Sequence, residues 1–425
     1  MINKFKLNEL GSVNRGKSKH RPRNAPELYG GKYPFIQTGD VKHSPFYVTS
    51  HSQTYNEKGL SQSKLWSEGT LCITIAANIA DTAILSYPAC FPDSIIGFLP
   101  NKEKADVKYV KYCLDTFQLQ MKSISQGTTQ DNMSVEKLLS IEFPAPELKT
   151  QKNIAAILSA YDDLIENNKR RIALLENMAE EIYREWFVRF RFPGYQSTEF
   201  EKGIPKGWGN DKANLFFDHV KGKSYKSDEI SKVDENSMPF ITLKSFNRGG
   251  GYRSDGLKSY SGKYSTKQVV FEGDVVMAVT DMTQNREVVG RVARVPDVGE
   301  KGAVISLDVI KLTPKTISST YLYSYMKYSG FGDFIKSFAN GANVLHLKPD
   351  LVTQQVIVVP PEKLRNQFEA IVEPMHEQVG FLTKEIVNLE ETKKSLLPRL
   401  ISGKLSVENL DIQLPPSMQT TAEAE

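Results

Sequence analysis

The stretch IAAILSAYDDLIENNKRRIALLENMAEEIYREW, from Ile154 to Trp186, decides how this chain folds. Apolar residues recur along it at alternating spacings of four and three, which is the pattern of a helix that packs one apolar stripe against a second helix. At about 1.5 Å per residue, such a helix would extend roughly 50 Å. One stripe position is the polar Asn168, a type of substitution that costs stability but can fix register. The seam positions assigned here are Ile154, Leu158, Ile165, Asn168, Ile172 and Leu175.

A second stripe with the same spacing begins at Phe368 and superposes on the first at a constant offset of 214 residues. Its seam positions are Phe368, Val372, Val379, Leu382, Ile386 and Leu389. Its polar member, Lys393, does not align with Asn168. The first helix leads into the second half of the chain and the second helix leaves it, so a parallel pair would force the chain to cross the full helix length. We therefore predict an antiparallel coiled coil.

The segments that precede the two stripes also resemble one another. YPFIQTGDV (33–41) returns as MPFITLKSF (238–246), and EGTLCIT (68–74) returns as EGDVVMA (272–278) in the same order. Matches that keep their order indicate an internal duplication. Short β-branched and aromatic runs in both halves, such as VISLDVIKL (304–312), predict strands, and longer runs such as STYLYSYMKYSGFGDFIKSF (319–338) predict helices.

The predicted fold class is therefore α+β, with a pseudo-twofold internal repeat. Two similar mixed α/β domains are separated by two long helices. The predicted boundaries are 1–148 for the first domain, 149–192 for the central helix, 193–203 for a linker, 204–361 for the second domain, 362–405 for the C-terminal helix and 406–425 for a tail. The tail is rich in Pro, Thr, Ala and Glu, a composition typical of disorder.

The segment GSVNRGKS (11–18) matches G-x-x-x-x-G-K-S, the phosphate-binding loop of nucleotide hydrolases. Its counterpart in the second half, FDHVKGKS (217–224), keeps the Gly-Lys-Ser tripeptide but replaces the first glycine with Phe217. A phosphate loop also needs a buried strand before it, and FKLNEL (5–10) has only three apolar residues. We interpret the match as a Gly-Lys turn that occurs once in each half.

No catalytic constellation stands out in the sequence. The six histidines and three cysteines have no metal-ligand spacing, and no pair of acidic residues with a nearby lysine indicates a nuclease. VVPPEK (358–363) lacks the Asn/Asp-Pro-Pro-aromatic pattern of a base methyltransferase. We expect a non-catalytic chain that binds neither a metal nor a cofactor.

The net charge of +4 and the pI of about 8.6 permit an anionic partner without arguing for one. The sequence begins without the apolar region of a signal peptide, and no apolar run approaches the ~20 residues of a membrane span. We therefore expect a cytoplasmic protein without a membrane partner.

Several predicted loops are rich in groups that suit DNA. Arg can bond bidentately to guanine, Asn or Gln can do so to adenine, and Lys can hold phosphate. The candidate DNA-binding residues of the first half are Lys17, Gln37, Lys42, His43, Thr74 and Asn78. Those of the second half are Lys223, Lys244, Asn247, Arg248, Arg253, Gln284, Asn285 and Arg286. The alternative is that these loops are ordinary solvated hairpins.

Taken together, these features resemble a specificity subunit of a type I restriction–modification system, the HsdS family. The resemblance rests on PFIQTGDV and PFITLKSF, on EGTLCIT and EGDVVMA, on QGTTQDNMSVEKL before PAPELKTQKNIAAIL, and on IPKGW at the start of the second half. The helix phrases IENNKRRIALLENMAEEIYREWFVRF and LTKEIVNLEETKKSLLPRLISGKL complete it. It covers residues 5–407.

The resemblance implies two target recognition domains, each of which reads one half of a bipartite, asymmetric sequence in double-stranded DNA. It implies that the long helices set the unread spacer and dock two adenine-DNA methyltransferase subunits, which recruit motor–nuclease subunits for phage defence. S-adenosylmethionine, ATP and Mg²⁺ would belong to those partners. Tyr183, Phe187 and Phe190 become candidates for partner contact, with packing against the adjacent domain as the alternative.

Two other functions stay open from the residues alone. One is a coiled-coil scaffold whose repeated domains bind protein and have no role on DNA. The other is an enzyme, either the nucleotide hydrolase that GSVNRGKS suggests or a self-contained nuclease.

Overall fold

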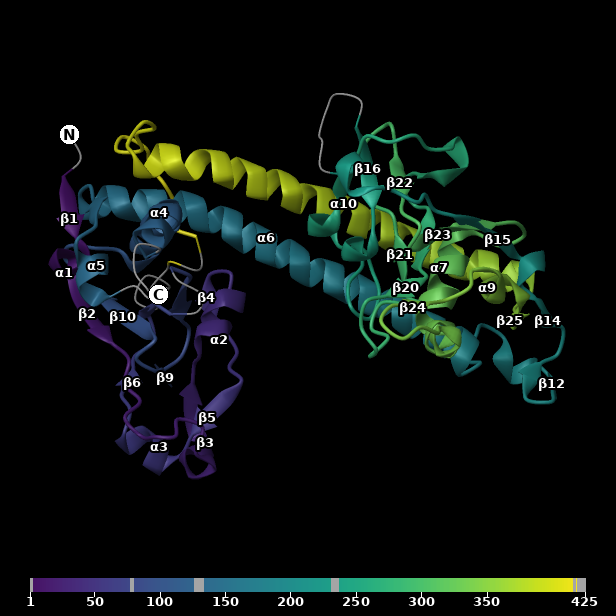
Figure 1. Ribbon diagram of the computed structural model, residues 1–425, viewed down its shortest axis with the longest axis horizontal. Coiled ribbons are helices and arrows are strands. Elements are labelled where there is room, and N and C mark those ends of the chain that lie inside the picture. Colours follow the sequence, from purple (N-terminus) through teal and green to yellow (C-terminus); the bar gives the residue numbers. More distant parts are fainter. Residues whose placement is uncertain (1–2, 77–79, 126–133, 231–236, 416–417, 419–425) are drawn as a thin grey trace. The chain divides into compact units, whose positions relative to one another are not determined.

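The computed structural model describes residues 3–76, 80–125, 134–230, 237–415 and 418 (Figure 1). It contains two compact units, formed by Met1–Asn167 with Ile386–Glu425 and by Asn168–Glu385. Two long helices, α6 (Leu148–Tyr183) and α10 (Glu362–Ile401), are each divided between the units. The central helix, which we predicted over 149–192, ends in a π-helical turn, Arg184–Val188. The division into units thus passes through both helices, whereas the sequence led us to treat each helix as a segment of its own.

The first unit is built on two sheets and a short strand pair. The larger sheet has the order β2 (Gly11–Arg15), β10 (Ile95–Pro100), β7 (Leu71–Thr74), β8 (Thr82–Leu85) and β4 (Tyr47–Val48). The smaller sheet has the order β5 (Gln53–Tyr55), β3 (Tyr29–Phe35), β9 (Ala89–Cys90) and β6 (Leu65–Trp66). The pair is β1 (Lys4–Lys6) with β11 (Glu142–Pro144). The helices besides α6 and α10 are α1 (Leu7–Leu10), α2 (Thr38–His43), α3 (Glu57–Ser61), α4 (Val107–Ser125) and α5 (Val135–Leu139).

The second unit repeats this plan. One sheet has the order β15 (Phe217–Lys221), β23 (Val309–Pro314), β19 (Val275–Ala278) and β21 (Val292–Arg294). The other has the order β17 (Lys258–Tyr260), β16 (Met238–Ile241), β22 (Ala303–Ile305) and β18 (Val269–Val270). Three strand pairs complete it: β12 (Phe200–Glu201) with β13 (Ile204–Pro205), β14 (Gly209–Lys212) with β25 (Val356–Val359), and β20 (Thr280–Asp281) with β24 (Leu345–His346). The short helices are α7 (Ser319–Tyr328), α8 (Phe331–Ile335) and α9 (Asp350–Gln354).

The two units share their strand directions as well as their strand order. The β2–β10–β7–β8 run and the β15–β23–β19–β21 run are antiparallel throughout. In the smaller sheets, β3 with β9 and β16 with β22 are the parallel pairs, and their outer neighbours are antiparallel. A mixed sheet with the same single parallel pair in both halves confirms the predicted internal repeat and the α+β fold class.

Some predicted elements are divided by turns. The apolar run VISLDVIKL (304–312) looks like one strand, but its two ends lie in different sheets, as β22 and β23. Similarly, the helical run 319–338 breaks between α7 and α8 at Gly330. Gly330 has a φ of +86°, a conformation that glycine adopts without steric cost.

The described part of the tail does not match the predicted disorder of 406–425. Val407 is fully buried, and its carbonyl accepts a hydrogen bond from Asn153 Nδ2 at 3.3 Å. Ile412 and Met418 pack against the same core as Ile154. The composition of the tail is polar, but its few apolar residues are enough to cover the start of α6.

The Gly-Lys turns are structural in both units. A Cβ atom on Gly16 would lie 2.2 Å from Pro92 O, and one on Gly222 would lie 2.0 Å from Ser306 O. The amides of Gly16 and Gly222 donate to Ile95 O and Val309 O, so each turn lies directly against a neighbouring strand. In the described chain, no α-helix begins directly after either turn, and a phosphate loop requires one. Close backbone approach therefore explains the glycines.

Within each unit, α6 and α10 run antiparallel, as predicted. In the first unit Asp162 of α6 contacts Lys393 of α10, and in the second unit Tyr183 contacts Phe368. All of the predicted seam positions, which lie in the described part of the chain, are buried or half-buried.

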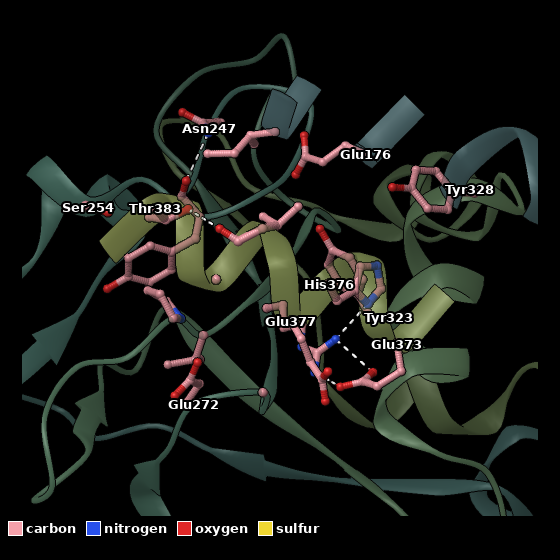
Figure 2. Close-up of a pocket in the computed structure, with 18 residues that line it drawn as sticks. Glu176, Asn247, Ser254, Glu272, Tyr323, Tyr328, Glu373, His376, Glu377 and Thr383 are labelled. Atoms are coloured by element: carbon pink, nitrogen blue, oxygen red, sulfur yellow. Dashed lines mark hydrogen bonds and ion pairs between the residues drawn. The ribbon is translucent and has the colours of Figure 1, made fainter. Parts of the chain in front are cut away.

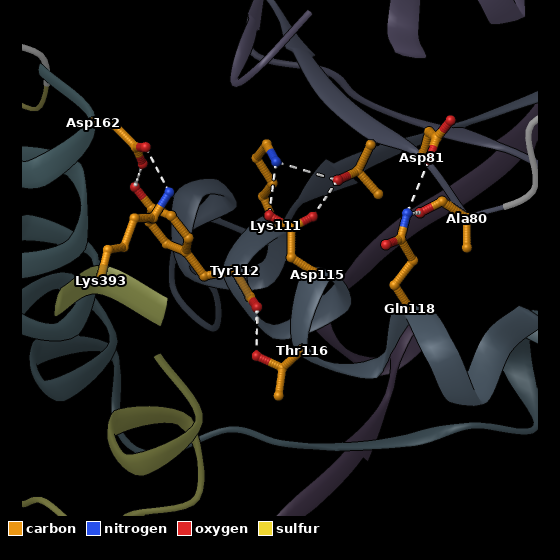
Figure 3. A network of polar contacts seen from close by, with 10 residues as sticks. Ala80, Asp81, Lys111, Tyr112, Asp115, Thr116, Gln118, Asp162 and Lys393 are labelled. Carbon is orange, nitrogen blue, oxygen red and sulfur yellow. Dashed lines mark hydrogen bonds and ion pairs between the residues drawn. The ribbon is translucent and has the colours of Figure 1, made fainter. Parts of the chain in front are cut away.

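Each polar seam residue has a carboxylate partner on the opposite helix. Lys393 Nζ lies 2.5 Å from Asp162 Oδ1, and the hydroxyl of Tyr112 on α4 donates to Asp162 Oδ2 at 2.5 Å (Figure 3). In the second unit, Asn168 Nδ2 donates to Glu385 Oε2 at 3.0 Å. A polar pair that forms in one alignment fixes the register of the helices.

Candidate nucleic-acid interface

Three loops of the second unit are joined by contacts, and two of them carry most of its predicted DNA-binding residues. They are residues 244–253, the chain 279–291 between β19 and β21, and residues 339–346. The first two are joined by an ion pair of 3.1 Å between Arg248 Nε and Glu287 Oε2. The second and third are joined where β20 pairs with β24. We refer to residues 281–289 as the reading loop, because three of the residues predicted to contact bases, Gln284, Asn285 and Arg286, lie in it.

Asp281 fixes the conformation of the reading loop through hydrogen bonds to its backbone. Its side chain is buried, and its carboxylate accepts hydrogen bonds from the backbone amides of Thr283, Val288 and Val289 at 2.7–3.1 Å and from the Thr283 hydroxyl. Burial raises the pKa of Asp281, but these hydrogen bonds outweigh it and hold the pKa below its ordinary value. The carboxylate therefore stays charged and the loop stays folded around it.

Two predicted base-reading residues make hydrogen bonds that hold the reading loop in place. Gln284 Nε2 donates to Ala342 O at 2.8 Å, and an Arg286 guanidinium nitrogen donates to Ala339 O at 3.3 Å. Arg286 also has a φ of +53°, a strained conformation that persists only where surrounding contacts fix it. Asn285 lies between them and is exposed.

The 244–253 loop is braced in a similar way. Asn247 Nδ2 donates to Tyr252 O at 3.1 Å, and Arg253 forms an ion pair of 2.6 Å with Asp255. Arg248 and Lys244 are exposed. Lys223 lies outside these loops, half-buried in the Gly-Lys turn beside Ser306.

In the first unit the candidates are more dispersed. Gln37 precedes α2 and its side chain donates to Gln53 Oε1 at 2.6 Å, while Lys42 and His43 are exposed in the last turn of α2. His43 Nδ1 lies 2.7 Å from Gly39 O. Lys17 is exposed in its Gly-Lys turn. These side chains occupy the surface, as expected for DNA contacts.

Thr74 is not available to DNA, and that part of our prediction is wrong. It is fully buried in β7, and its hydroxyl exchanges hydrogen bonds with the backbone of Asp81. The hydroxyl thus closes the base of the loop between β7 and β8. Gln118 of α4 also holds this loop, donating to Ala80 O and Asp81 Oδ1 (Figure 3). Asn78 lies outside the described residues.

Two of the three proposed partner-contact residues are also inaccessible. Tyr183 is 2% exposed and Phe187 is 8% exposed, and both pack around Phe368 and Tyr321 in the core of the second unit. Phe190 is half-buried against Trp208. The alternative, packing against the adjacent domain, holds for Tyr183 and Phe187. They fall at buried positions of the helix, because the stripe continues into the π-helical turn.

The long helices expose other apolar side chains. Leu174 and Met178 are 62% and 52% exposed, and they lie one turn apart on α6. Phe381 of α10 is 63% exposed in the same unit. These positions lie between the seam residues, so a search restricted to the heptad stripe misses them.

A cavity of about 540 Å³ in the second unit is lined by residues of α6, α7, β21 and α10 (Figure 2). Three of its polar groups contact one another: Arg294 makes an ion pair of 2.6 Å with Glu373 and donates to His376 Nδ1 at 2.6 Å. Burial and the adjacent Arg294 lower the pKa of His376 to about 4. His376 is therefore neutral at neutral pH and accepts the hydrogen bond.

Among the described residues, no group of three or more His, Cys, Asp or Glu side chains could hold a metal ion. The same residues include no helix that is both long and apolar enough to cross a membrane.

The three loops form a surface that hydrogen bonds and an ion pair hold in place, and this surface exposes amide, cationic and thioether groups. Sequence analysis missed the thioether, Met282, because it considered only polar base-reading groups.

Comparison with known proteins agrees with this arrangement. Residues 2–177 match a family model described as the type I restriction modification DNA specificity domain. The chain is 27% identical to the type I restriction enzyme MjaIX specificity subunit of Methanocaldococcus jannaschii, over 95% of this chain and 94% of that protein. It is 23% identical to the MjaVIII specificity subunit of the same organism, over 90% and 88%. A crystal structure of the type I restriction–modification S subunit from M. genitalium shares the fold, with a TM-score of 0.60 and 18% identity over 94% of this chain and 96% of that one.

Proposed function

Because the chain belongs to the specificity subunits of type I restriction–modification systems, we propose that each of its units reads one half of a bipartite, asymmetric DNA sequence. The first unit reads one half-site and the second unit reads the other. The chain supplies sequence recognition to a larger complex and carries out no chemistry itself.

One observation carries this proposal: the two units share a framework but differ in the loops that leave it. Seven residues connect β7 to β8, whereas thirteen connect the corresponding strands β19 and β21. The reading loop therefore has no counterpart of equal length in the first unit. Two units with identical loops, related by a twofold axis, would recognise the two identical halves of a palindromic site. Two units that share a framework but have different loops are therefore expected to recognise two different half-sites.

Exposed cations would provide the sequence-independent part of binding. Lys17 and Lys42 in the first unit and Lys244 and Arg248 in the second are exposed. Contacts from such groups to phosphates position a protein on the duplex and make its affinity depend on salt. Base-edge contacts then select the sequence.

The long helices would dock the partner subunits. Leu174, Met178 and Phe381 expose apolar surface that a soluble protein usually covers by association when such residues are contiguous. We assign them, in place of Tyr183 and Phe187, as the contact surface for the adenine-DNA methyltransferase subunits. S-adenosylmethionine, ATP and Mg²⁺ would act on the methyltransferase and motor–nuclease subunits.

Exchange of one unit tests this function. Residues 168–385 form the second unit as a single stretch of chain, so they can be replaced by the same unit of another specificity subunit. We expect methylome sequencing of cells with the whole system to show a change in one half of the target only. Exchange of residues 1–145 is the matched experiment and should change the other half. A change in both halves after either exchange would contradict separate reading.

A further inference from the structure

The reading loop has two side chains whose position the loop fixes but whose groups it does not use. In this loop, which the structure describes throughout, seven of nine side chains are engaged. The engaged residues are Asp281, Thr283, Gln284, Arg286, Glu287, Val288 and Val289. The two others are Met282, which is 68% exposed, and Asn285, which is also exposed.

The rigidity of the loop distinguishes Met282 from an ordinary exposed apolar residue. Single exposed apolar residues are common and usually need no explanation. Met282, however, follows directly after the buried Asp281, whose carboxylate accepts four hydrogen bonds from the loop. The neighbouring 339–346 segment fixes the far side of the loop through Gln284 and Arg286. The loop thus presents the Met282 thioether and the Asn285 amide, neither of which contributes to the loop's own hydrogen bonds, on a backbone whose conformation is already fixed.

These two groups match the major-groove edge of an A·T base pair. Adenine presents N7 and the N6 amino group, to which an Asn amide can bond bidentately, and thymine presents a methyl group that apolar side chains contact. A methionine thioether is flexible and polarisable enough to pack against that methyl group. A G·C pair offers no methyl group to the thioether and no adjacent donor and acceptor on one base that match both atoms of the amide.

We infer that the reading loop recognises A·T pairs in the half-site of the second unit, with Met282 against a thymine methyl group and Asn285 bonded to an adenine. This inference rests on the proposed function, since it assumes that the second unit reads bases. Gln284 and Arg286 are positioning residues in this assignment, because their side chains hold the loop.

Base analogues that remove single atoms test the two contacts. The wild-type chain, assembled with its methyltransferase subunits, is titrated with target duplexes in which each thymine in turn is replaced by deoxyuridine. Loss of one methyl contact should weaken binding about fourfold at one position. The Met282→Ala complex should be insensitive to deoxyuridine at that position, and Met282→Leu should retain the sensitivity.

A parallel series replaces each adenine by 7-deazaadenine, which removes the N7 acceptor. We expect about a fivefold or greater loss at one position for the wild-type complex, and no loss there for Asn285→Ala. Leu215→Ala and Asn210→Ala are matched controls, because both side chains are exposed elsewhere in the second unit. They should keep the wild-type pattern in both series.

The outcomes separate this inference from the proposed function. If the wild-type complex binds its target specifically but Met282→Ala and Asn285→Ala keep its full sensitivity to both analogues, the loop assignment is overturned and the proposed function stands. The loop assignment is also overturned, while the proposed function stands, if the half-site read by the second unit contains no A·T pair. If the wild-type complex shows no sequence preference, the proposed function fails and the loop assignment fails with it.

Discussion

Single buried polar residues decide where the loops of this protein lie. In the nine-residue reading loop, the Asp281 carboxylate does what the regular hydrogen bonds of a helix or strand do elsewhere. It accepts hydrogen bonds from three backbone amides that would otherwise lack partners. Thr74 has a comparable role in the first unit, where its hydroxyl bonds both backbone groups of Asp81. A buried polar residue at the base of a loop therefore fixes the loop backbone, and the backbone in turn fixes the position of the exposed side chains on that loop.

Asp281 predicts a specific pH response of the reading loop. Its pKa is held below the ordinary value, so its contribution to stability is present above the unfolded pKa of about 3.9 and is lost as the pH falls through the lower folded value. Hydrogen exchange of the Thr283, Val288 and Val289 amides, corrected for intrinsic rates, should show protection that fades only below about pH 4. Asp281→Asn should lower protection by about 1–3 kcal/mol at neutral pH and remove the acid dependence.

The control for this measurement is Asp211→Asn, which changes an exposed carboxyl group in the same unit. It should leave the protection of the three amides and its pH dependence unchanged. Equal behaviour of the two variants would show that Asp281 does not organise the loop.

At the level of elements, the paired long helices combine an apolar seam with a few polar pairs. The seam supplies buried area in any register that keeps the stripes together. The polar pairs add discrimination, because Lys393 meets Asp162 and Asn168 meets Glu385 in one alignment only. A slip of one heptad would leave each of these groups without its partner, at a cost of about 1–3 kcal/mol per buried or half-buried group.

Lys393→Met tests the pair in the first unit. The substitution keeps the aliphatic stem but leaves Asp162 with only the Tyr112 hydroxyl, so we expect a loss of about 1–2 kcal/mol in urea unfolding. In a double-mutant cycle, Asp162→Asn combined with Lys393→Met should recover part of that loss. The exposed neighbour Lys394 provides the control as Lys394→Met. Similar losses at both lysines would rule out a specific role for the pair.

The sequence predicted those features that depend on repeated patterns. The heptad spacing predicted both long helices and their direction, and the ordered matches predicted the duplicated sheets. It did not predict the role of Gln284 and Arg286, because their hydrogen bonds go to backbone carbonyls at 339 and 342, which no side-chain pattern reveals. Thr74 and Tyr183 were misassigned for a related reason: residue type indicates what a side chain can bind, but burial decides whether it can be reached.

On the scale of the whole molecule, one unit is continuous in sequence and the other is made of two separate segments. The second unit is one continuous stretch, Asn168–Glu385, whereas the first combines Met1–Asn167 with Ile386–Glu425. In the first unit, Ile154 and Leu158 share a core with Leu400, Ile401 and Val407. The first unit is therefore complete only when both of its segments are present.

Expression of fragments tests this difference. Residues 168–385 alone should unfold in one cooperative transition, because their core is contained within the fragment. Residues 1–167 alone should bind a dye that recognises exposed apolar surface, and a peptide of residues 386–418 should remove that binding. Calorimetry and dye fluorescence provide the two measurements. Equal stability of 1–167 with and without the peptide would contradict a shared core.

The divided first unit also has a consequence for synthesis on the ribosome. Its opening segment emerges first, but the residues that cover Ile154 and Leu158 follow the 218 residues of the second unit. At about 5–20 residues per second, the nascent chain waits roughly 10–45 s with that surface uncovered. The later-made unit thus completes its fold before the earlier one. The interval is a period in which chaperones, or a second nascent copy, can reach the uncovered helix.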